Sequence, residues 1–166
     1  METKSNSTTQ RVTPFLWFAD RAEEAINFYI SIFKDSEIVS MSRLPAEAPG
    51  KEGRMFMATI RIKGQELMIL EAGPMFEFTP AISFFVHCAE QEEVDFLWDK
   101  LTADGGKPSQ CGWLVDKYGV SWQIVPDALG RLMGDPNRAK AGAVQQAMMK
   151  MIKLDSAVLQ AAYDGK

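Results

Sequence analysis

The chain offers few side chains suited to acid–base chemistry, and Glu71 is the first of them. Glu71 ends an apolar run, residues 67–70, that predicts a buried strand. A carboxylate at the rim of an apolar hollow is suited to take a proton from a bound molecule, so Glu71 is our candidate catalytic residue. The alternative is a hydrated carboxylate at a strand end, because charged side chains usually stay in water.

His87, the only histidine, and Cys111 are two further residues of reactive type. An imidazole transfers protons near neutral pH, but it needs a partner that orients it, and its sequence neighbours supply none. A nucleophilic thiolate needs a nearby base, cation or helix N-terminus, and none is local to Cys111. We therefore favour structural roles, with His87 at a strand end and Cys111 as a small buried apolar residue.

Aromatic rings, one thiol and one amide form a second group of candidates, for ligand binding. Rings at alternating strand positions can line a pocket for a flat or apolar ligand, with a few polar groups to orient it. The alternative is that each ring packs against a helix as part of the core. The ligand-pocket candidates are Trp17, Phe56, Phe78, Cys111, Trp113 and Gln123.

The elements that must hold these side chains occur in two similar copies. A strand over residues 12–18 precedes an amphipathic helix that Asp20 is placed to cap. A strand over 80–88 and a helix over 91–103 repeat the order. One constant shift of 69 pairs apolar positions of the two helices: Ala25 with Val94, Phe28 with Leu97, Tyr29 with Trp98, and Ile32 with Leu101. The fold is therefore predicted to use one module twice.

Further strands follow each helix, joined by hairpin turns. Lys63-Gly64 predicts a tight turn, and Asp104-Gly105-Gly106 predicts the end of the second helix. The predicted strands are residues 37–43, 54–62 and 66–71 in the first copy, and 111–115 and 120–125 in the second; residues 44–53 form a loop.

The predicted organisation is a single domain with an N-terminal tail and a C-terminal helical extension that belongs to the same domain. Residues 1–10 are polar and lack the apolar segment of a signal peptide, so we expect a disordered tail. Residues 11–134 form the domain, with modules at about 11–72 and 79–126. Residues 135–166 form a helical extension, with Asp135 capping its first helix and Asp155 its last.

Composition excludes several classes of partner. A net charge of -4 argues against nucleic acid, which requires clustered Lys and Arg. No apolar run approaches the ~20 residues that span a bilayer, so no membrane partner is expected. The two cysteines, Cys88 and Cys111, lack CxxC spacing and are typical of reduced thiols in a cytoplasmic protein.

The doubled order of one strand, one helix and three strands resembles the vicinal oxygen chelate superfamily, which includes glyoxalase I, bleomycin and fosfomycin resistance proteins and extradiol dioxygenases. Within it the chain is similar to the PhnB-like branch, often labelled 3-demethylubiquinone-9 3-methyltransferase. The motifs that carry this resemblance are Leu16-Trp17-Phe18 with Ala22-Glu23-Glu24-Ala25 and Phe28-Tyr29, Gln91-Glu92-Glu93-Val94-Asp95 with Trp98, and Cys111-Gly112-Trp113-Leu114 with Asp116, Gly119 and Ser121-Trp122-Gln123.

The resemblance implies an α+β fold in which tandem βαβββ modules form a cupped mixed sheet, with C-terminal helices. It also implies a homodimer. Superfamily enzymes hold a divalent ion with side chains from the first, fourth, fifth and eighth strands. Those positions fall at Val12 or Thr13, at Met68 or Glu71, at Ala81, and at Gln123. One carboxylate and one amide at most are too few for a tight site, so we predict no metal and no cofactor.

Three functional hypotheses remain. The first, which we favour, is a metal-free protein that binds a small organic ligand in the cup. The second is an enzyme of the same fold, using Glu71, Gln123 or a borrowed metal for isomerase, lyase or transferase chemistry. The third is a dimeric interaction module with a vestigial pocket. Methyl transfer by the common cofactor-binding fold is not favoured, because no glycine-rich turn links a strand to a helix.

Overall fold

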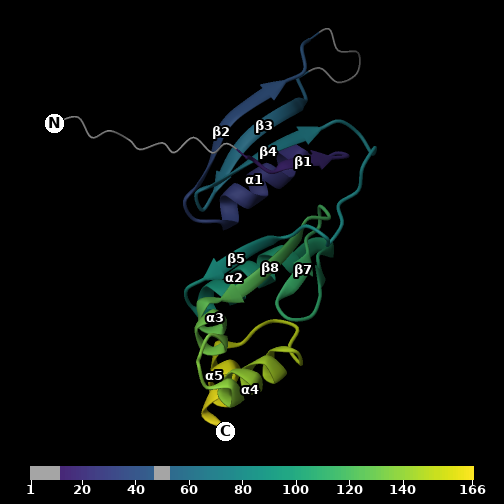
Figure 1. Ribbon diagram of the computed structural model, residues 1–166. Helices are drawn as coiled ribbons and strands as arrows, with labels where there is room; N and C mark the ends of the chain where they lie inside the picture. Colours follow the sequence, from purple (N-terminus) through teal and green to yellow (C-terminus); the bar gives the residue numbers. More distant parts are fainter. Residues whose placement is uncertain (1–11, 47–52) are drawn as a thin grey trace, which may run out of the picture. The chain divides into compact units, whose positions relative to one another are not determined.

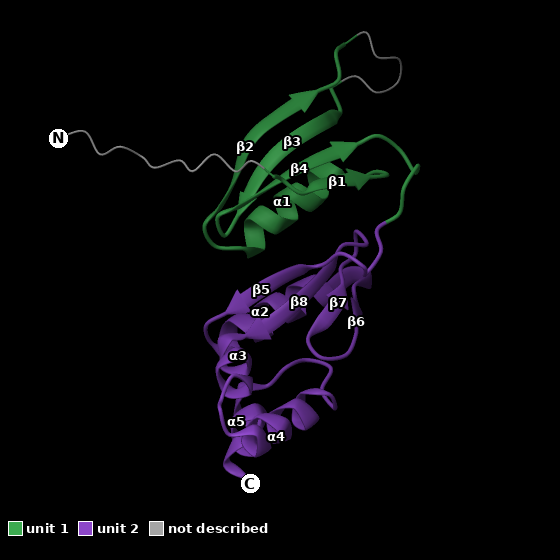
Figure 2. Cartoon of the chain, in the orientation of Figure 1, with its two compact units in different colours: residues 1–77 green, residues 78–166 purple. Residues whose placement is uncertain are grey.

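The computed structural model describes residues 12–46 and 53–166 (Figure 1). The predicted tail at residues 1–10 and most of the predicted loop at 44–53 lie outside them. The chain divides into two compact units, residues 1–77 and 78–166 (Figure 2), and each is described by itself. No helix in the described ranges is long and apolar enough to cross a membrane.

The first unit is a four-stranded mixed sheet with one helix. Its strands lie in the order β1-β4-β3-β2, with β1 parallel to β4 and the other pairs antiparallel. Lys63 and Gly64 both have positive φ, 46° and 87°, which confirms the predicted tight turn between β3 and β4. The elements are β1 (Phe15–Phe18), α1 (Ala22–Ile32), β2 (Ser36–Arg43), β3 (Met55–Ile62) and β4 (Gln65–Glu71).

The second unit repeats this topology and adds three helices. Its strands lie in the order β5-β8-β7-β6, with β5 parallel to β8, so the predicted duplication is confirmed. The elements are β5 (Phe84–Cys88), α2 (Gln91–Thr102), a 3-10 turn (Ala103–Gly105), β6 (Lys107–Pro108), β7 (Trp113–Val115), β8 (Ser121–Pro126), α3 (Asp127–Met133), α4 (Arg138–Met148) and α5 (Ser156–Asp164).

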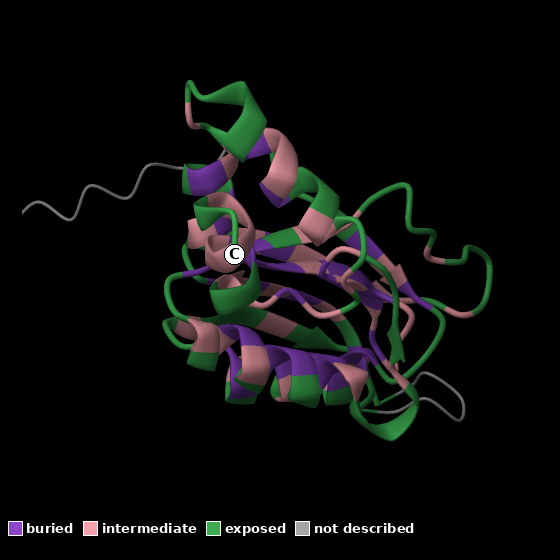
Figure 3. Ribbon diagram, turned by 90° about the horizontal axis from the view of Figure 1, so that it is seen from below, coloured by how far each residue is buried: buried purple, intermediate pink, exposed green. Residues whose placement is uncertain are grey.

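In the first unit, side chains alternate between a face packed on the helix and an open face. Along β3, Ala58, Ile60 and Ile62 are buried, whereas Thr59 and Arg61 remain half-buried. α1 buries its apolar stripe of Ala22, Ala25, Ile26, Tyr29 and Ile32. Figure 3 shows buried segments along the strands and on the helices. Because a strand has a period of two, one face of the sheet forms the core and the other stays available.

Matching positions of the two modules differ in residue number by one amount in the strands and by another in the helices. Buried Phe18 of β1 corresponds to buried Cys88 of β5, 70 positions later, whereas the helices begin 69 positions apart, at Ala22 and Gln91. The first module therefore has one extra residue between strand and helix. Arg21, just before α1, has a φ of 57°, so a left-handed residue ends this longer link.

Several predicted boundaries are wrong for local reasons. β5 begins at Phe84 rather than residue 80, because Thr79 bonds the backbone amide of Ala81 in a turn. The cap of α4 is Asn137 rather than Asp135, whose carboxylate instead accepts the Asn137 amide. β1 and β7 also begin later than predicted, and the sequence did not predict α3. The predicted Asp155 cap of α5 is confirmed by bonds of 2.8 and 3.0 Å.

The turn between β7 and β8 is organised by a buried carboxylate. Asp116 is 3% exposed, and its Oδ1 accepts the amides of Tyr118 and Val120 at 2.9 and 3.0 Å. Its Oδ2 accepts the indole N–H of Trp122 at 2.8 Å. These bonds fix the start of β8, the strand that carries Gln123. Removing an acceptor shared by three buried donors is costly, because each donor then lacks its partner.

Asp116→Ala is therefore expected to lower the free energy of unfolding by about 2–4 kcal/mol, measured by urea denaturation. Asp20→Ala is the matched control, because Asp20 is exposed and lies outside any helix or strand. We expect the control to change stability by less than about 0.5 kcal/mol. Equal midpoints for both variants would contradict the role given to Asp116.

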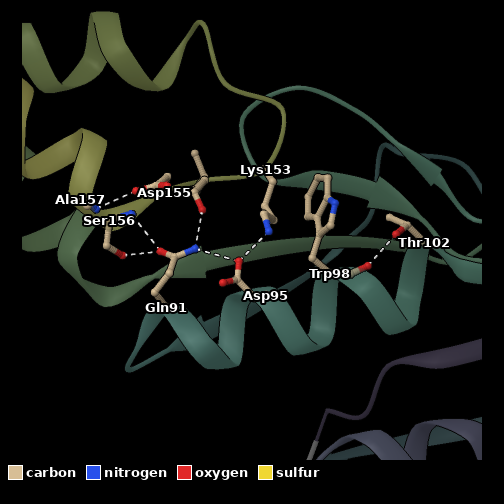
Figure 4. Close-up of polar contacts among 9 residues, drawn as sticks. Gln91, Asp95, Trp98, Thr102, Lys153, Asp155, Ser156 and Ala157 are labelled. Atoms are coloured by element: carbon tan, nitrogen blue, oxygen red, sulfur yellow. Dashed lines mark hydrogen bonds and ion pairs between the residues drawn. The ribbon is translucent and has the colours of Figure 1, made fainter.

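The C-terminal helices have their own core and are tied to α2 by polar contacts. Their core is continuous with β8, since Val125 packs in one cluster with Leu129, Leu132, Val144, Leu154 and Leu159. Figure 4 shows Gln91 of α2 contacting the segment before α5. Its amide oxygen accepts the Ser156 backbone N–H and hydroxyl, both at 2.8 Å, and its amide nitrogen donates to the Leu154 carbonyl at 3.0 Å. One turn later, Asp95 pairs with Lys153 at 2.6 Å (Figure 4).

The Asp95–Lys153 pair makes the attachment of the extension dependent on pH. The hydrogen bond from Lys153 lowers the pKa of Asp95 below its ordinary 3.8, and the same bond raises the pKa of Lys153 above 10.5. A lowered carboxyl pKa stabilises the fold above about pH 4, and this contribution is lost as the pH falls through the folded pKa. A raised amine pKa stabilises it below about pH 10, and this contribution is lost as the pH rises through the folded pKa.

We expect Asp95→Asn to lower the Tm by at most about 3 °C at pH 7, because the pair is partly exposed and contributes no more than about 1 kcal/mol. The difference from the unsubstituted protein should disappear as the pH falls below the folded pKa of Asp95. Scanning calorimetry at several pH values measures it. Asp164→Asn, in the exposed pair with Lys166, is the control and should show no such dependence. A difference that persists at acid pH would contradict the assignment.

Candidate functional site

The open face of the second sheet carries an amide between two aromatic rings. Phe85 of β5 and Trp113 of β7 are both direct partners of Gln123 on β8, so the three side chains form one row across neighbouring strands. The Gln123 amide donates to the Ser83 hydroxyl at 2.9 Å, which fixes its orientation. Phe85 is 49% exposed, and Trp113 is half-buried. The structure thus brings together two predicted pocket residues, Trp113 and Gln123, and adds Phe85.

His87 has an orienting partner that the sequence did not reveal. Its Nδ1 lies 3.3 Å from Oδ1 of Asp127, the first residue of α3, and its ring centroid is 4.8 Å from that of Phe85. Both members of the pair are exposed. The contact arises because β5 runs parallel to β8, which aligns Cys88 with Pro126 and brings the next residue beside His87. Only the strand register could have indicated it.

Glu71 lies on the covered face of the first sheet and is neither hydrated nor isolated. It is aligned with buried Phe18, and its side chain is 9% exposed. Its Oε2 accepts the backbone N–H of Ala22 at 2.8 Å, while Oε1 pairs with the guanidinium of Arg54. Glu71 thus satisfies the N-terminus of α1, the role that the sequence gave to Asp20, and that prediction is wrong.

A hollow of about 410 Å³ lies at the end of the first sheet, next to Glu71. Phe56, another predicted pocket residue, lines it. Trp17 lies on the open face and its indole N–H donates to the carbonyl of Gly73, a residue that also lines the hollow, at 2.8 Å. The lining residues are Ala19, Leu44, Arg54, Met55, Phe56, Glu71, Ala72 and Gly73. The structure therefore gathers Trp17, Phe56 and Glu71 at one end of this sheet.

The two remaining predicted pocket residues lie apart from these groups. Phe78 lies beside Gly119, and Gly119 belongs to the turn before β8. Cys111 has a φ of 57°, and its thiol faces the end of α4, 3.6 Å from the Met148 carbonyl and 4.0 Å from the Met149 sulfur. Its side chain therefore contacts the C-terminal extension rather than Trp113 and Gln123.

The donors at the superfamily's metal positions do not fit a divalent ion. Residues 12–14 and Ala81 precede their strands, and only Met68 and Gln123 project from the open faces, offering a thioether and an amide. Hard divalent ions prefer carboxylate oxygens, and divalent transition-metal ions also bind imidazole. Across residues 12–46 and 53–166, no three His, Cys, Asp or Glu side chains lie close enough to share a metal ion.

Comparisons with known proteins agree with this fold. The family model described as 3-demethylubiquinone-9 3-methyltransferase matches residues 10–125. A PhnB protein from Bacillus cereus is 45% identical, with a TM-score of 0.65, over 70% of this chain and 99% of its own. The chain therefore belongs to the PhnB-like family described by this 3-demethylubiquinone-9 3-methyltransferase model.

More distant structures share the fold alone. A protein from Pseudomonas aeruginosa is 18% identical, with a TM-score of 0.57, over 71% of this chain and 98% of its own. The fosfomycin resistance protein FosX from Listeria monocytogenes, solved with Mn(II) and sulfate, is 15% identical, with a TM-score of 0.50, over 69% of this chain and 88% of its own. A search of curated proteins gave no match. The helices α3 to α5 lie beyond the residues that the family model matches.

Proposed function

We propose that the protein binds a small organic molecule on the open face of its second sheet, without a resident divalent ion. The observation that carries this proposal is the row of Phe85, Gln123 and Trp113. Side chains directly opposite on neighbouring strands lie about 5 Å apart, close enough to contact one flat ligand together. The rings supply apolar contact area, and the amide supplies both a donor and an acceptor.

This chemistry favours a planar ligand with a polar edge. Ser83 holds the amide nitrogen of Gln123, so the amide is oriented before a ligand arrives, and less conformational entropy is lost on binding. Because Phe85, Gln123 and Trp113 are all uncharged, the row favours a ligand with a neutral hydrogen-bonding group over an ionic ligand.

Acid–base catalysis is a second candidate function, and the His87–Asp127 contact favours it. His87 lies on the same face of β5 as Phe85, two residues along the strand, so a ligand on the row would lie beside the imidazole. A carboxylate next to one ring nitrogen orients the ring. Such a pair is suited to the proton transfers of an isomerase or lyase.

The proposal predicts that Gln123→Leu and Trp113→Ala weaken binding of a planar aromatic amide, for which benzamide is the probe. Loss of the amide contact should weaken binding about 5- to 10-fold, measured by titration calorimetry. Gln65→Leu makes the same chemical change at the exposed first residue of β4 and should leave affinity unchanged. Prior treatment with EDTA should also have no effect. Benzamide affinity that is unchanged in both row variants, or that depends on an added divalent ion, would reject the proposal.

We also propose that the protein is a homodimer, as its resemblance to the family implies, and that it is cytoplasmic, as its two cysteines without CxxC spacing indicate. The edge strand β2 supports this, because Ile38 and Val39 are 41% and 46% exposed there. An edge with exposed apolar side chains favours association. Light scattering of the full chain should give twice the monomer mass, and Val39→Lys should lower that mass. A monomer at micromolar concentration would contradict the dimer.

A further inference from the structure

We propose that the hollow at the end of the first sheet is a binding site for a small carboxylate with an apolar body, and that Arg54 is its anion-binding residue. The site is separate from the row of Phe85, Gln123 and Trp113, and it does not depend on that proposal. Its described lining residues all belong to the first unit.

The Arg54 guanidinium is held in place by a carboxylate that is itself fixed. Glu71 is 9% exposed, and its Oε2 is anchored by the Ala22 amide at the start of α1. Its Oε1 accepts from Nη2 of Arg54, whose side chain is 50% exposed. The Glu71 carboxylate is therefore held by both of its oxygens, and Arg54 lines the hollow. Orienting a guanidinium in advance reduces the entropy lost when an anion binds.

The other described arginines of the first unit are held differently. Arg21 and Arg43 pair with exposed glutamates, at 50% for Glu24 and 39% for Glu23. Arg61 is shared between exposed Glu37, at 60%, and half-buried Glu66, at 29%. Exposed pairs of this kind contribute little and exchange readily with water. The Arg54–Glu71 pair instead joins a nearly buried anion to a cation beside a hollow.

A carboxylate ligand matches the hydrogen-bond donors of Arg54 other than the one that Glu71 accepts. A guanidinium has five N–H donors in a planar fork, and Glu71 accepts from Nη2. The other donors suit two parallel bonds to a planar carboxylate. The walls supply the apolar complement through Leu44, Met55 and Phe56, of which Phe56 is 39% exposed. The volume of about 410 Å³ lies within the range of small-molecule sites.

This inference changes the role given to Glu71. Both of its oxygens are engaged, one by α1 and one by Arg54. It is therefore a positioning residue that acts through Arg54, rather than a general base that touches the ligand.

The test uses the full chain with cyclohexanecarboxylate as probe and cyclohexanecarboxamide as its uncharged counterpart. We expect one carboxylate to bind per chain, with a shift of the Arg54 Nε–H signal in NMR spectra. The carboxamide should bind at least 10-fold more weakly. Arg54→Met should weaken carboxylate binding at least 10-fold, whereas Arg61→Met, which removes a guanidinium from the open face, should not. If Arg54→Met unfolds the unit, Arg54→Lys keeps the charge, loses the fork and should still weaken binding.

Glu71→Gln tests whether Glu71 positions Arg54 in addition to bonding the start of α1. The glutamine oxygen can still accept the Ala22 amide, so the Tm should change little, while carboxylate affinity falls several-fold and the Arg54 Nε–H signal broadens. Gln123→Leu should leave carboxylate binding intact, and Arg54→Met should leave benzamide binding intact, so the two sites fail separately. Equal affinities for carboxylate and carboxamide, equal effects of Arg54→Met and Arg61→Met, or no saturable carboxylate binding would each overturn the proposal.

Discussion

In the first unit, α1 covers the four-stranded sheet on one face, and this one-sided packing decides what each strand residue can do. Side chains on the covered face, such as Ile60 and Ile69, are fully buried, and each contributes about 1.5–3 kcal/mol by leaving water. Their neighbours on the open face make no such contribution and are available for binding. A shift of one residue in register would exchange the two sets, so the core and the candidate sites are specified together.

Glu71 and Gln123 illustrate this rule from opposite sides. Each lies near the end of a central strand, and the sequence made both candidates for chemistry. Glu71 lies on the same face of β4 as buried Leu67 and Ile69, so its carboxylate points to the helix and bonds the start of α1. Gln123 alternates with buried Trp122 and Ile124, so its amide lies on the open face. A carboxylate on the helix side is suited to structure, and an amide on the open side is suited to recognition.

Local signals in the sequence predicted much of the fold, because they depend on neighbouring residues alone. The helical stripes, the Lys63-Gly64 turn and the Asp155 cap need no knowledge of distant segments. The capping of α1 by Glu71 and the contact of His87 with Asp127 each join residues at least 40 positions apart. They follow from parallel strand pairing, whose register the sequence does not state. The sequence therefore did not reveal either of these two contacts.

The helices after β8 contribute a carboxylate to the proposed proton-transfer site. The family model ends at residue 125, two positions before Asp127, so the carboxylate beside His87 belongs to α3, beyond the matched residues. The extension is held by buried apolar side chains and by the bonds of Gln91 to Ser156, which fix α5 on the N-terminus of α2. Because α3 follows β8 directly, a rigid extension also fixes the position of Asp127. Docking of these helices is thus coupled to the orientation of the only histidine, and so to any proton transfer that it performs.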